Sequence, residues 1–533
     1  MNVERWDTCE FAFRATDSYT NPFRDVELVV TFTHEPSGRA ITVNGFHDGD
    51  ATWRVRFMPT ELGAWRYTTA STDPGLNGQT GGLECVKPVK PYLHGPLACR
   101  GYHFFHADGT PRFLISTRLS CQFAAPEIWA RVIPFLQAHR INRVFFIMGG
   151  VAGTLRDLFG EGPDFDRYNV AKWRAIDAFI DALRGAGIQA GPYFYYFNDG
   201  VLRGLSPEQD RAYIKYGMAR FGAYANVMPV LSNEVEQKYT VRYGGRMDEY
   251  DLRSQAWANE MGPYLKELAV FGVPVTVHNP MENFAATNPG FYTLLYDWPF
   301  PWADYMMRQA QVGSLGAVPE LRDDVPETTG AVFNERAYAR HNQLMIDLRK
   351  HGIPVINEEP GYEMGGASWE DAVVGQRSWN TQTAWRLLST FWTAAAAGCY
   401  AMWGSPATYE LGDPMWGLLD SAVPERLRIL HDFMIRFPYW QMAPANEAVS
   451  ANGVEIEGAS YRTNYCLARA GERYLVFSLH GGTLSLDLQA GTRYYLTHLD
   501  PRTGEERYLG LVGGGECVVT LPAREQVLLA QRV

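Results

Sequence analysis

Hydrophobic and polar residues alternate along the first part of the chain. In the stretch ATWRVRFMP, the apolar Trp53, Val55 and Phe57 are separated by polar residues, which is the two-residue period of a half-buried β-strand. The stretches DVELVVTFTH and GAWRYTTAS predict further strands, and the glycine-rich TDPGLNGQTGG predicts a turn-rich loop. Short strands joined by such turns predict a β-sandwich over residues 1–95.

Between residues 96 and 438 the pattern changes to apolar runs that mostly do not alternate and that are followed by helical patterns. Runs of this kind are typical of parallel strands buried on both faces. The predicted strands are 112–117, 142–148, 188–196, 227–234, 273–279, 291–298, 353–359 and 399–404. The predicted helices are 126–139, 170–186, 207–224, 252–271, 334–350, one that passes through Trp385, and one near 424–436. Eight such units predict an α/β fold, the (β/α)8 TIM barrel. The alternative is a doubly wound open sheet, but no GxGxxG motif follows the first strand.

Strand patterns return over residues 439–533, in RYLVFSLH, TLSLDLQ and EQVLLAQRV. The sequence DPRTGE between two of the predicted strands predicts a hairpin turn. The chain is therefore expected to hold a central barrel, residues 96–438, flanked by an N-terminal sandwich, residues 1–95, and a C-terminal sandwich, residues 439–533.

Composition narrows the class of ligand. The 533 residues carry a net charge of −11, which argues against a protein that binds nucleic acid or an anionic membrane surface. Aromatic residues make up 14% of the chain, and their flat amphipathic rings suit sugar binding, although they also fill ordinary cores.

Cysteines and the N-terminal stretch bear on the compartment and on metals. The seven cysteines form no CxxC pair and no metal-ligand spacing, so we expect reduced thiols, no catalytic metal and no cofactor. MNVERWDTCEFAFRATDSY has no apolar signal region, which predicts a cytoplasmic protein. The chain contains no GxSxG motif, so the sequence does not indicate a serine hydrolase.

Polar residues follow the predicted strands where a barrel places its working groups, at the carboxyl ends. Strand four ends in Asn233 and Glu234, and strand five in His278. Strand six ends near Tyr296, strand seven reads NEEP, and strand eight ends in Trp403. Carboxylates at two strand ends are what glycosidic bond cleavage requires, since one acid protonates the leaving oxygen while the other attacks or stabilises the sugar carbon.

Strand seven offers two adjacent glutamates for one role. Strict alternation puts Val355, Asn357 and Glu359 on one face, and Glu358 on the other. Pro360 holds the residue before it extended. We therefore expect Glu359 to face the barrel axis as nucleophile and Glu358 to point outward, toward a loop or helix, with Glu358 as the alternative nucleophile.

These motifs carry a family resemblance. Asn-Glu after strand four and a glutamate after strand seven, 125 residues apart, resemble the retaining (β/α)8 glycoside hydrolases of clan A. PVINEEPGYE resembles the strand-seven signature of the apiosidase-like barrel family. RVRFMPTELGAWRYTT is similar to an uncharacterised β-sandwich domain often found ahead of such barrels, and the C-terminal sandwich is similar to one labelled collagen-binding.

The resemblance implies roles for particular residues. Glu234 would be the acid/base, Glu359 the nucleophile, and Asn233 the partner of the sugar 2-hydroxyl. Tyr296 would steady the nucleophile, and Trp403 would form the floor under the reacting ring. A retaining enzyme of this kind places the two carboxyl groups about 5–5.5 Å apart. Strand four reads Asn-Glu where the apiosidase-like pattern carries an aspartate, so the resemblance does not extend to apiose specificity.

Two further polar residues each allow two interpretations. His278 is either a buried structural histidine or a sugar ligand, and Arg118 either pairs with a catalytic carboxylate or braces the barrel. After strand three, Tyr196 and Asn198 are expected to lie nearest the pocket. Glu236 and Glu363 are expected to be loop charges, with a contact to sugar hydroxyls as the alternative for Glu363.

The predicted function is a retaining, exo-acting glycoside hydrolase for small oligosaccharides or glycosides. A non-catalytic carbohydrate-binding barrel and a transglycosylase that uses the same site are the alternatives. The sequence leaves the sugar, the linkage and a homo-oligomeric state open.

Overall fold

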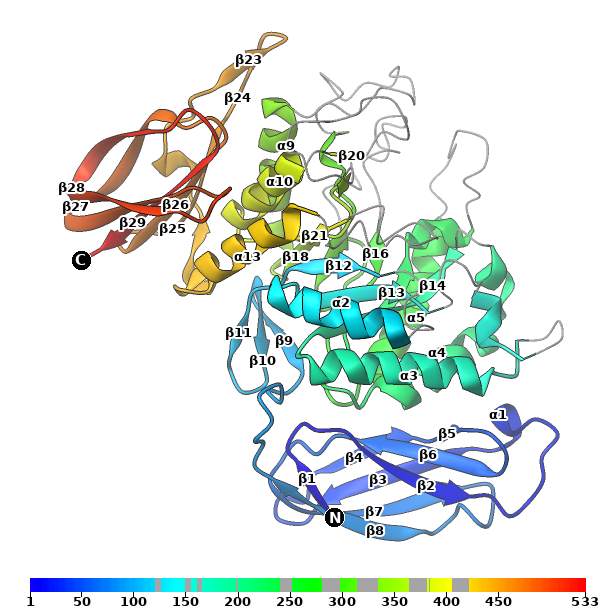
Figure 1. The fold of residues 1–533 in the computed structure, drawn as a ribbon. Helices are drawn as coiled ribbons and strands as arrows, with labels where there is room; N and C mark the ends of the chain where they lie inside the picture. The colour runs from blue at the N-terminus through cyan, green and yellow to red at the C-terminus, as the bar shows by residue number, and fades with distance from the viewer. Residues whose placement is uncertain are drawn as a thin grey trace.

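The structure is a computed structural model in which a central barrel lies between two β-rich parts (Figure 1). It describes residues 1–119, 126–148, 155–160, 165–197, 200–239, 252–279, 298–313, 334–363, 381–382, 384–404 and 421–533. The N-terminal strands lie against one side of the barrel, and the C-terminal strands lie beside helices α9, α10 and α13. The predicted fold class is confirmed.

The N-terminal part is a β-sandwich. One sheet has the order β1 (Asn2–Glu4), β8 (Thr80–Val86), β7 (Gly63–Ser71), β3 (Leu28–His34) and β4 (Ala40–Asn44). The other has the order β2 (Cys9–Arg14), β6 (Thr52–Phe57) and β5 (Phe46–His47), and the short helix α1 (Pro22–Asp25) follows β2 in the chain. Alternate residues of β3 are buried, and Phe32 stacks on Phe57 of the second sheet with ring centroids 3.9 Å apart. The two-residue period therefore places one face of each sheet in a shared core.

Buried ion pairs join this sandwich to the barrel. Arg56 of β6 contacts Asp177 of the barrel at 2.9 Å, and Arg220 of the barrel contacts Asp48 of the sandwich at 3.1 Å. All four side chains are buried, and a buried charge is costly without its partner. Each charge on the sandwich therefore requires the opposite charge on the barrel, which fixes the interface.

Eight parallel strands form the barrel. In chain order they are β12 (Ser116–Arg118), β13 (Arg143–Ile147), β14 (Gln189–Tyr196), β15 (Val230–Asn233), β16 (His278–Asn279), β17 (Met306–Arg308), β18 (Val355–Asn357) and β21 (Tyr400–Trp403). The sheet runs β15-β14-β13-β12-β21-β18-β17-β16. A parallel bridge between Val230 and Thr276, with the Leu231 amide donating to the Thr276 carbonyl at 2.8 Å, brings its two edges together.

Helices pack around these strands, and their bounds agree with the helical patterns to within a few residues. They are α2 (Pro126–Ala138), α3 (Val170–Gly185), α4 (Pro207–Phe221), α5 (Leu252–Leu268), α9 (Glu335–Leu348), α10 (Ala384–Ala396) and α13 (Val423–Met434). Polar caps set several starts: Ser206 and Gln209 form a capping box at α4, and Asn334 caps α9.

The sixth strand lies elsewhere than the sequence predicted. The structure places β17, residues Met306–Arg308, between β16 and β18, so the prediction of strand six at 291–298 is wrong. FYTLLYDW is the longer apolar run, whereas β17 is three residues long and carries a buried arginine. A charged residue inside a short barrel strand gives no hydrophobic period to detect.

The C-terminal part is one six-stranded sheet of order β22-β25-β26-β29-β27-β28, with a small hairpin beside it. Its strands are β22 (Ala443–Pro444), β23 (Val454–Ile456), β24 (Ala459–Tyr461), β25 (Asn464–Arg469), β26 (Arg473–Ser478), β27 (Gly482–Leu499), β28 (Glu506–Leu521) and β29 (Gln526–Arg532). The first half of β27 pairs with β28 and bridges to Val449, and its Leu486 shares a core with Val476 and Leu528, so the sheet folds over itself. The hairpin turn predicted at DPRTGE is confirmed by the pairing of Leu499 with Glu506.

Three short strands connect the N-terminal sandwich to the barrel: β9 (Leu97–Arg100), β10 (His103–His106) and β11 (Pro111–Arg112). The domain limits at 95 and 438 stay predictions. No helix within the described ranges is long and apolar enough to cross a membrane.

Candidate active site

Strand β15 delivers Glu234 at the carboxyl end of the barrel. The strand ends at Asn233, and the 3-10 turn η5 (Val235–Lys238) begins directly after Glu234. Glu234 has φ 37° and ψ 64°, the left-handed region, which disfavours a residue with a Cβ by about 1–2 kcal/mol. Its side chain is 3% exposed, and Gln237 Nε2 donates to its Oε2 at 2.7 Å. Such a conformation persists where surrounding contacts fix the side chain in place, as at functional sites.

A buried lysine fixes the turn that follows Glu234. Lys238 Nζ lies 3.4 Å from Asp210 Oδ2 and 4.3 Å from the centroid of Trp257. Burial lowers the pKa of Lys238 and raises the pKa of Asp210. No sequence pattern predicts this pair, because its members lie 28 residues apart on different elements.

His278 of β16 braces strand four. Its Nδ1 lies 3.0 Å from Asn233 Oδ1 and 3.4 Å from the Glu234 amide, and the shorter contact fits an Nδ1–H that donates to Asn233. Burial, aided by the positive charges of Arg118 and Arg308, lowers the pKa of His278 to about 3. His278 is therefore neutral near pH 7. Its Nε2 has no hydrogen-bond partner among the described residues, so it is available to a substrate hydroxyl.

Glu358 points into the barrel and not outward. Arg143 Nη1 of β13 donates to both carboxylate oxygens of Glu358, at 3.2 and 3.1 Å, and Arg143 Nη2 donates to Tyr305 Oη at 3.1 Å. Both partners of the ion pair are buried. Burial raises the pKa of Glu358, and Arg143 opposes that shift.

The outward face of β18 belongs to Asn357. Its amide nitrogen lies 2.9 Å from His341 Nε2 of helix α9, and its oxygen accepts from the Ala310 amide at 3.0 Å. The alternation prediction was therefore wrong for this strand: Asn357 faces a helix and Glu358 faces the interior. The strand ends at Asn357, so the two-residue period does not continue through the glutamates.

Glu359 has a different environment from its neighbour. It is 9% exposed, and the Tyr362 hydroxyl donates to its Oε1 at 2.7 Å. Tyr362 belongs to β19 (Tyr362–Glu363), which bridges to Gly404 after strand eight. A hydroxyl that steadies this carboxylate was expected from Tyr296, which lies outside the described residues. Tyr362 stood within the quoted PGYE motif and was missed.

Trp403 and Glu363 form one buried unit. The Trp403 indole Nε1 donates to Glu363 Oε2 at 2.9 Å, and Ser421 Oγ contacts both oxygens of Glu363 at 2.7 Å. Burial raises the pKa of Glu363. The expectation that Glu363 and Glu236 are loop charges was wrong, because their side chains are 1% and 2% exposed.

Two comparisons with protein families assign the chain. Residues 147–440 match the family described as "Apiosidase-like, catalytic domain", which is more than half of the chain. Residues 2–72 match a domain of unknown function, DUF5060. The chain belongs to the apiosidase-like family.

Solved structures show the same fold. A proposed glycoside hydrolase from Bacteroides vulgatus ATCC 8482 is 19% identical, with a TM-score of 0.73 over 100% of both chains. A family 5 glycoside hydrolase from the same organism is 15% identical, with a TM-score of 0.59 over 84% of this chain and 94% of that one. At these identities the likeness concerns the fold. No curated protein sequence gives a match.

Of the remaining predicted site residues of this apiosidase-like barrel, the structure describes Arg118 but not Asn198 or Tyr296. Arg118 is 3% exposed, and its guanidinium carbon lies 5.9 Å from the Tyr196 ring centroid. Its positive charge partly opposes the rise that burial causes in the pKa of Glu358, and it adds to the lowering that burial causes in the pKa of His278, so it acts on the site electrostatically. Asn198, like Tyr296, lies outside the described residues.

Because strand six was predicted at the wrong position, the polar residues at its end were not predicted. The true strand brings Arg308 and then Gln309 and Gln311 to the barrel, all 1% exposed. Within the described ranges, no group of three His, Cys, Asp or Glu side chains could hold a metal ion.

Proposed function

We propose that this apiosidase-like protein is a retaining glycoside hydrolase that acts on small oligosaccharides or glycosides from a chain end. The observation that carries the proposal is the pair of carboxylates that follow strands β15 and β18, each held by its own hydrogen-bond donor. Gln237 donates to Glu234, and Tyr362 donates to Glu359. The family match adds a scaffold whose strand ends place such groups on one rim.

The mechanism is a double displacement. Glu359 attacks the anomeric carbon while Glu234 gives its proton to the departing glycosidic oxygen, which leaves as an alcohol. Glu234, now ionised, then takes a proton from water, and that water breaks the glycosyl ester and frees Glu359. We expect the two carboxyl groups about 5–5.5 Å apart, the separation typical of retention.

The contacts of strand seven support Glu359 over Glu358 as nucleophile. Both oxygens of Glu358 accept from the buried Arg143 guanidinium, which lowers their nucleophilicity and fixes the side chain inside the barrel. Glu359 is the more exposed of the two, and its bond from Tyr362 Oη involves one oxygen.

The substrate contacts are assigned as part of the same proposal. Asn233, held by His278 Nδ1, would bind the 2-hydroxyl, and His278 Nε2 would accept from a neighbouring hydroxyl. Trp403 would lie beneath the ring, with its indole oriented by Glu363. Arg118, Asn198 and Tyr296 remain proposed substrate-binding residues.

The test begins with a screen of aryl glycosides. On an active substrate, NMR of the first-formed product should show the anomeric configuration of the substrate, and inversion would contradict the retaining mechanism. A fluoro-sugar inactivator should label the peptide that contains residues 353–363 on Glu359. A label on Glu358 would contradict the assignment, and products longer than the substrate would indicate transglycosylation.

A further inference from the structure

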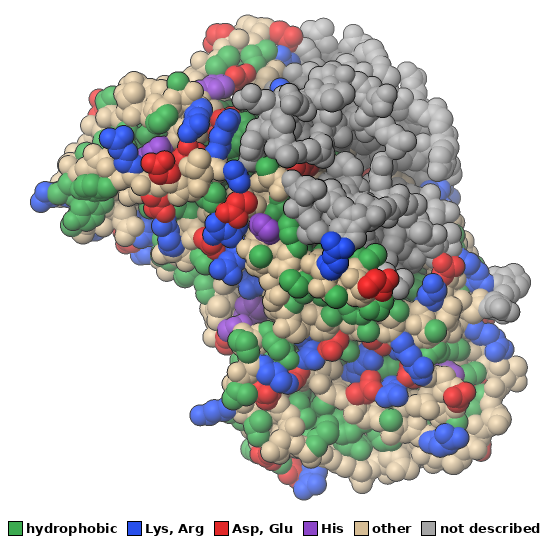
Figure 2. Space-filling model, viewed as in Figure 1, with side chains coloured by type: hydrophobic (Ala, Val, Ile, Leu, Met, Phe, Trp, Pro, Cys, Tyr) green, Lys and Arg blue, Asp and Glu red, His purple; other side chains and the backbone are tan. Residues whose placement is uncertain are grey.

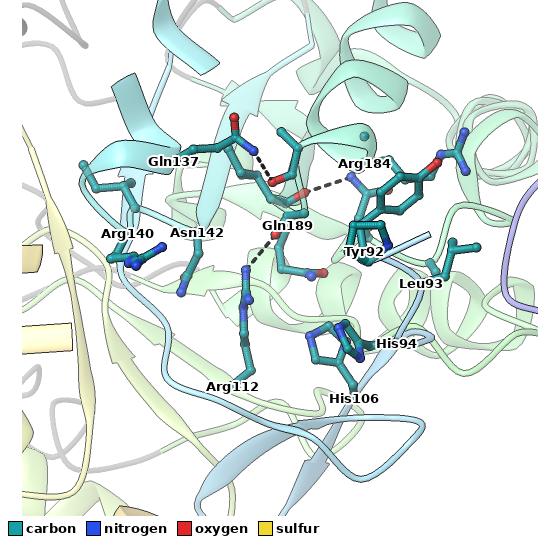
Figure 3. Close-up of a pocket in the computed structure, with 18 of the residues that line it drawn as sticks. Tyr92, Leu93, His94, His106, Arg112, Gln137, Arg140, Asn142, Arg184 and Gln189 are labelled. Atoms are coloured by element: carbon teal, nitrogen blue, oxygen red, sulfur yellow. Dashed lines mark hydrogen bonds between the residues drawn. The ribbon is translucent and has the colours of Figure 1, made fainter. Parts of the chain in front are cut away.

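A cavity lies at the end of the barrel opposite the candidate active site. Its volume is about 500 Å³, within the ~300–1,000 Å³ typical of small-molecule pockets. Asn142, Gln189 and Asn226 stand at or just before the starts of β13, β14 and β15, whereas Glu234 and Glu359 follow strand ends. The opposite wall comes from the linker around His94, from strands β10 and β11, and from helix α13 (Figure 3).

The charge of this lining differs from that of the whole chain. Acidic residues outnumber basic ones by 59 to 48 in the sequence, and the visible face mixes both signs (Figure 2). The described residues that line the cavity include three arginines and three histidines but no aspartate or glutamate: Arg112, Arg140, Arg184, His94, His106 and His431. The arginines therefore give the lining a positive charge, which favours an anionic ligand.

Arg112 is the cation that a ligand would meet. Arg140 pairs with Asp432 and Arg184 pairs with Asp181, so carboxylates outside the lining already compensate these two. Among the described residues, Arg112 has no carboxylate within ion-pair distance. Its Nη2 donates to the Gly187 carbonyl at 2.7 Å, and its Nε has no partner there. Figure 3 shows this side chain between those of Asn142 and Gln189, with His94 and His106 beside them.

The surroundings of Arg112 respond to its unbalanced charge. Burial lowers the pKa of Arg112 to about 10. Burial, with Arg112 as a further cause, lowers the pKa of both His106 and His431 to about 4. A partly buried guanidinium with no counter-ion among the described residues is costly, and a bound anion would relieve that cost.

Two unpartnered acceptors add a second chemical requirement. Gln189 and Asn226 are 3% and 5% exposed, and neither Gln189 Oε1 nor Asn226 Oδ1 has a donor among the described residues. Asn226 Nδ2 donates to the Ile180 and Ile188 carbonyls, which fixes its amide so that the oxygen is the free group. Buried acceptors of this kind are satisfied by the hydroxyls of a ligand or by water.

We propose that this cavity is a second, non-catalytic binding site for a small anion that also carries hydroxyl groups, such as a sugar carboxylate or a sugar phosphate. Arg112 binds the anionic group, while Gln189 and Asn226 accept from ligand hydroxyls. The site is independent of the glycosidase proposal, because it lies at the other end of the strands and uses none of the residues assigned to the reaction.

Calorimetry on the full chain at low salt tests this site with four probes: glucuronate, glucose 6-phosphate, glucose and inorganic phosphate. We expect at least one of the two hydroxylated anions to bind ten-fold or more tightly than either glucose or phosphate. Binding of glucuronate alone would identify a carboxylate ligand, and binding of glucose 6-phosphate alone a phosphate ligand. Equal binding of neutral glucose, or no binding of either anion, would overturn the proposal.

Substitutions of single arginines test whether the anion binds in this cavity. Arg112→Gln should weaken it at least ten-fold, whereas Arg140→Gln, which removes an arginine already paired with Asp432, should change it less than three-fold. Should Arg112→Gln not fold, Arg112→Lys keeps the charge and should retain most of the affinity. Imidazole NMR of the wild type gives a separate readout, since the anion should raise the pKa of His106 and His431. Undiminished affinity in folded Arg112→Gln, or unchanged imidazole signals at saturation, would place the ligand elsewhere and refute the site.

Discussion

The interior of the barrel and its rim give opposite environments to two adjacent glutamates. Glu358 lies in the interior, where Arg143 holds both of its oxygens and solvent reaches almost none of it. Glu359 lies one residue further, 9% exposed, and receives a hydroxyl from Tyr362. The interior uses a carboxylate as one half of a charge pair, whereas the rim holds the carboxylate that we propose as nucleophile. Adjacent residues of one type can therefore differ in role because their partners differ.

The largest expected effect separates the two roles by activity. Glu359→Gln should lower turnover on the order of 10⁴-fold or more, the scale on which loss of a nucleophile acts, with little change in the urea midpoint. Glu358→Gln is the matched control: it should lower the midpoint, because Arg143 loses its counter-ion, yet keep turnover within about ten-fold while folded. The reverse outcome would exchange the two assignments.

The interior role predicts a large effect on stability. Arg143→Met should destabilise the protein by about 3–5 kcal/mol, because it leaves the Glu358 carboxyl buried without a partner. Urea unfolding measures the loss. The double variant Arg143→Met with Glu358→Gln should recover most of it, since neither charge is then buried. A double variant as unstable as the single one would show that Arg143 acts through packing.

The hydrogen bond from Tyr362 to Glu359 allows a test of the environment at the rim. Tyr362→Phe removes a hydrogen bond to a charged group, which is typically worth about 1.5–3 kcal/mol. We therefore expect kcat/KM to fall by about 10- to 100-fold, with the fluoro-sugar labelling rate falling in parallel. Unchanged labelling would mean that Tyr362 does not act on Glu359.

A smaller, pH-dependent effect comes from the outward face of the same strand. His341 Nε2 accepts from Asn357, and burial lowers the pKa of His341 to about 3. The unfolded histidine titrates near 6.5, so the unfolded chain binds the proton first and stability falls as the pH decreases from about 6.5 toward 3. His341→Gln should reduce this slope by about 1.4 kcal/mol per pH unit in urea titrations. An unchanged slope in folded His341→Gln would contradict this role.

Particular residues show where sequence reasoning succeeded on the fold. The apolar runs around Val230 and Ile356, each with a polar residue at its end, predicted strands that the structure contains. Strand six failed, because Met306–Arg308 is short and buries an arginine that only the surrounding barrel can accommodate. The alternation argument failed at Glu358 because the regular strand ends at Asn357, one residue earlier.

The residues of the candidate site also fall into two groups, those that the sequence could predict and those that it could not. Glu234, Glu359, His278 and Trp403 could be named from the strand ends, because a parallel barrel puts every such end on one rim. Arg143, Lys238 and Asp210 could not be named, since their meaning comes from partners on other strands or helices. That Arg112 has no carboxylate partner among the described residues was hidden for the same reason.

By itself, the sequence determined the order and type of most elements, the barrel class and the candidate acids, because hydrophobic period and strand-end position are local properties of the chain. Only the tertiary structure decided which glutamate is neutralised by Arg143, which hydroxyl reaches Glu359 and that Arg112 has no ion-pair partner among the described residues. Charge pairing and burial depend on groups that the fold brings together from distant positions, and for these no local pattern exists.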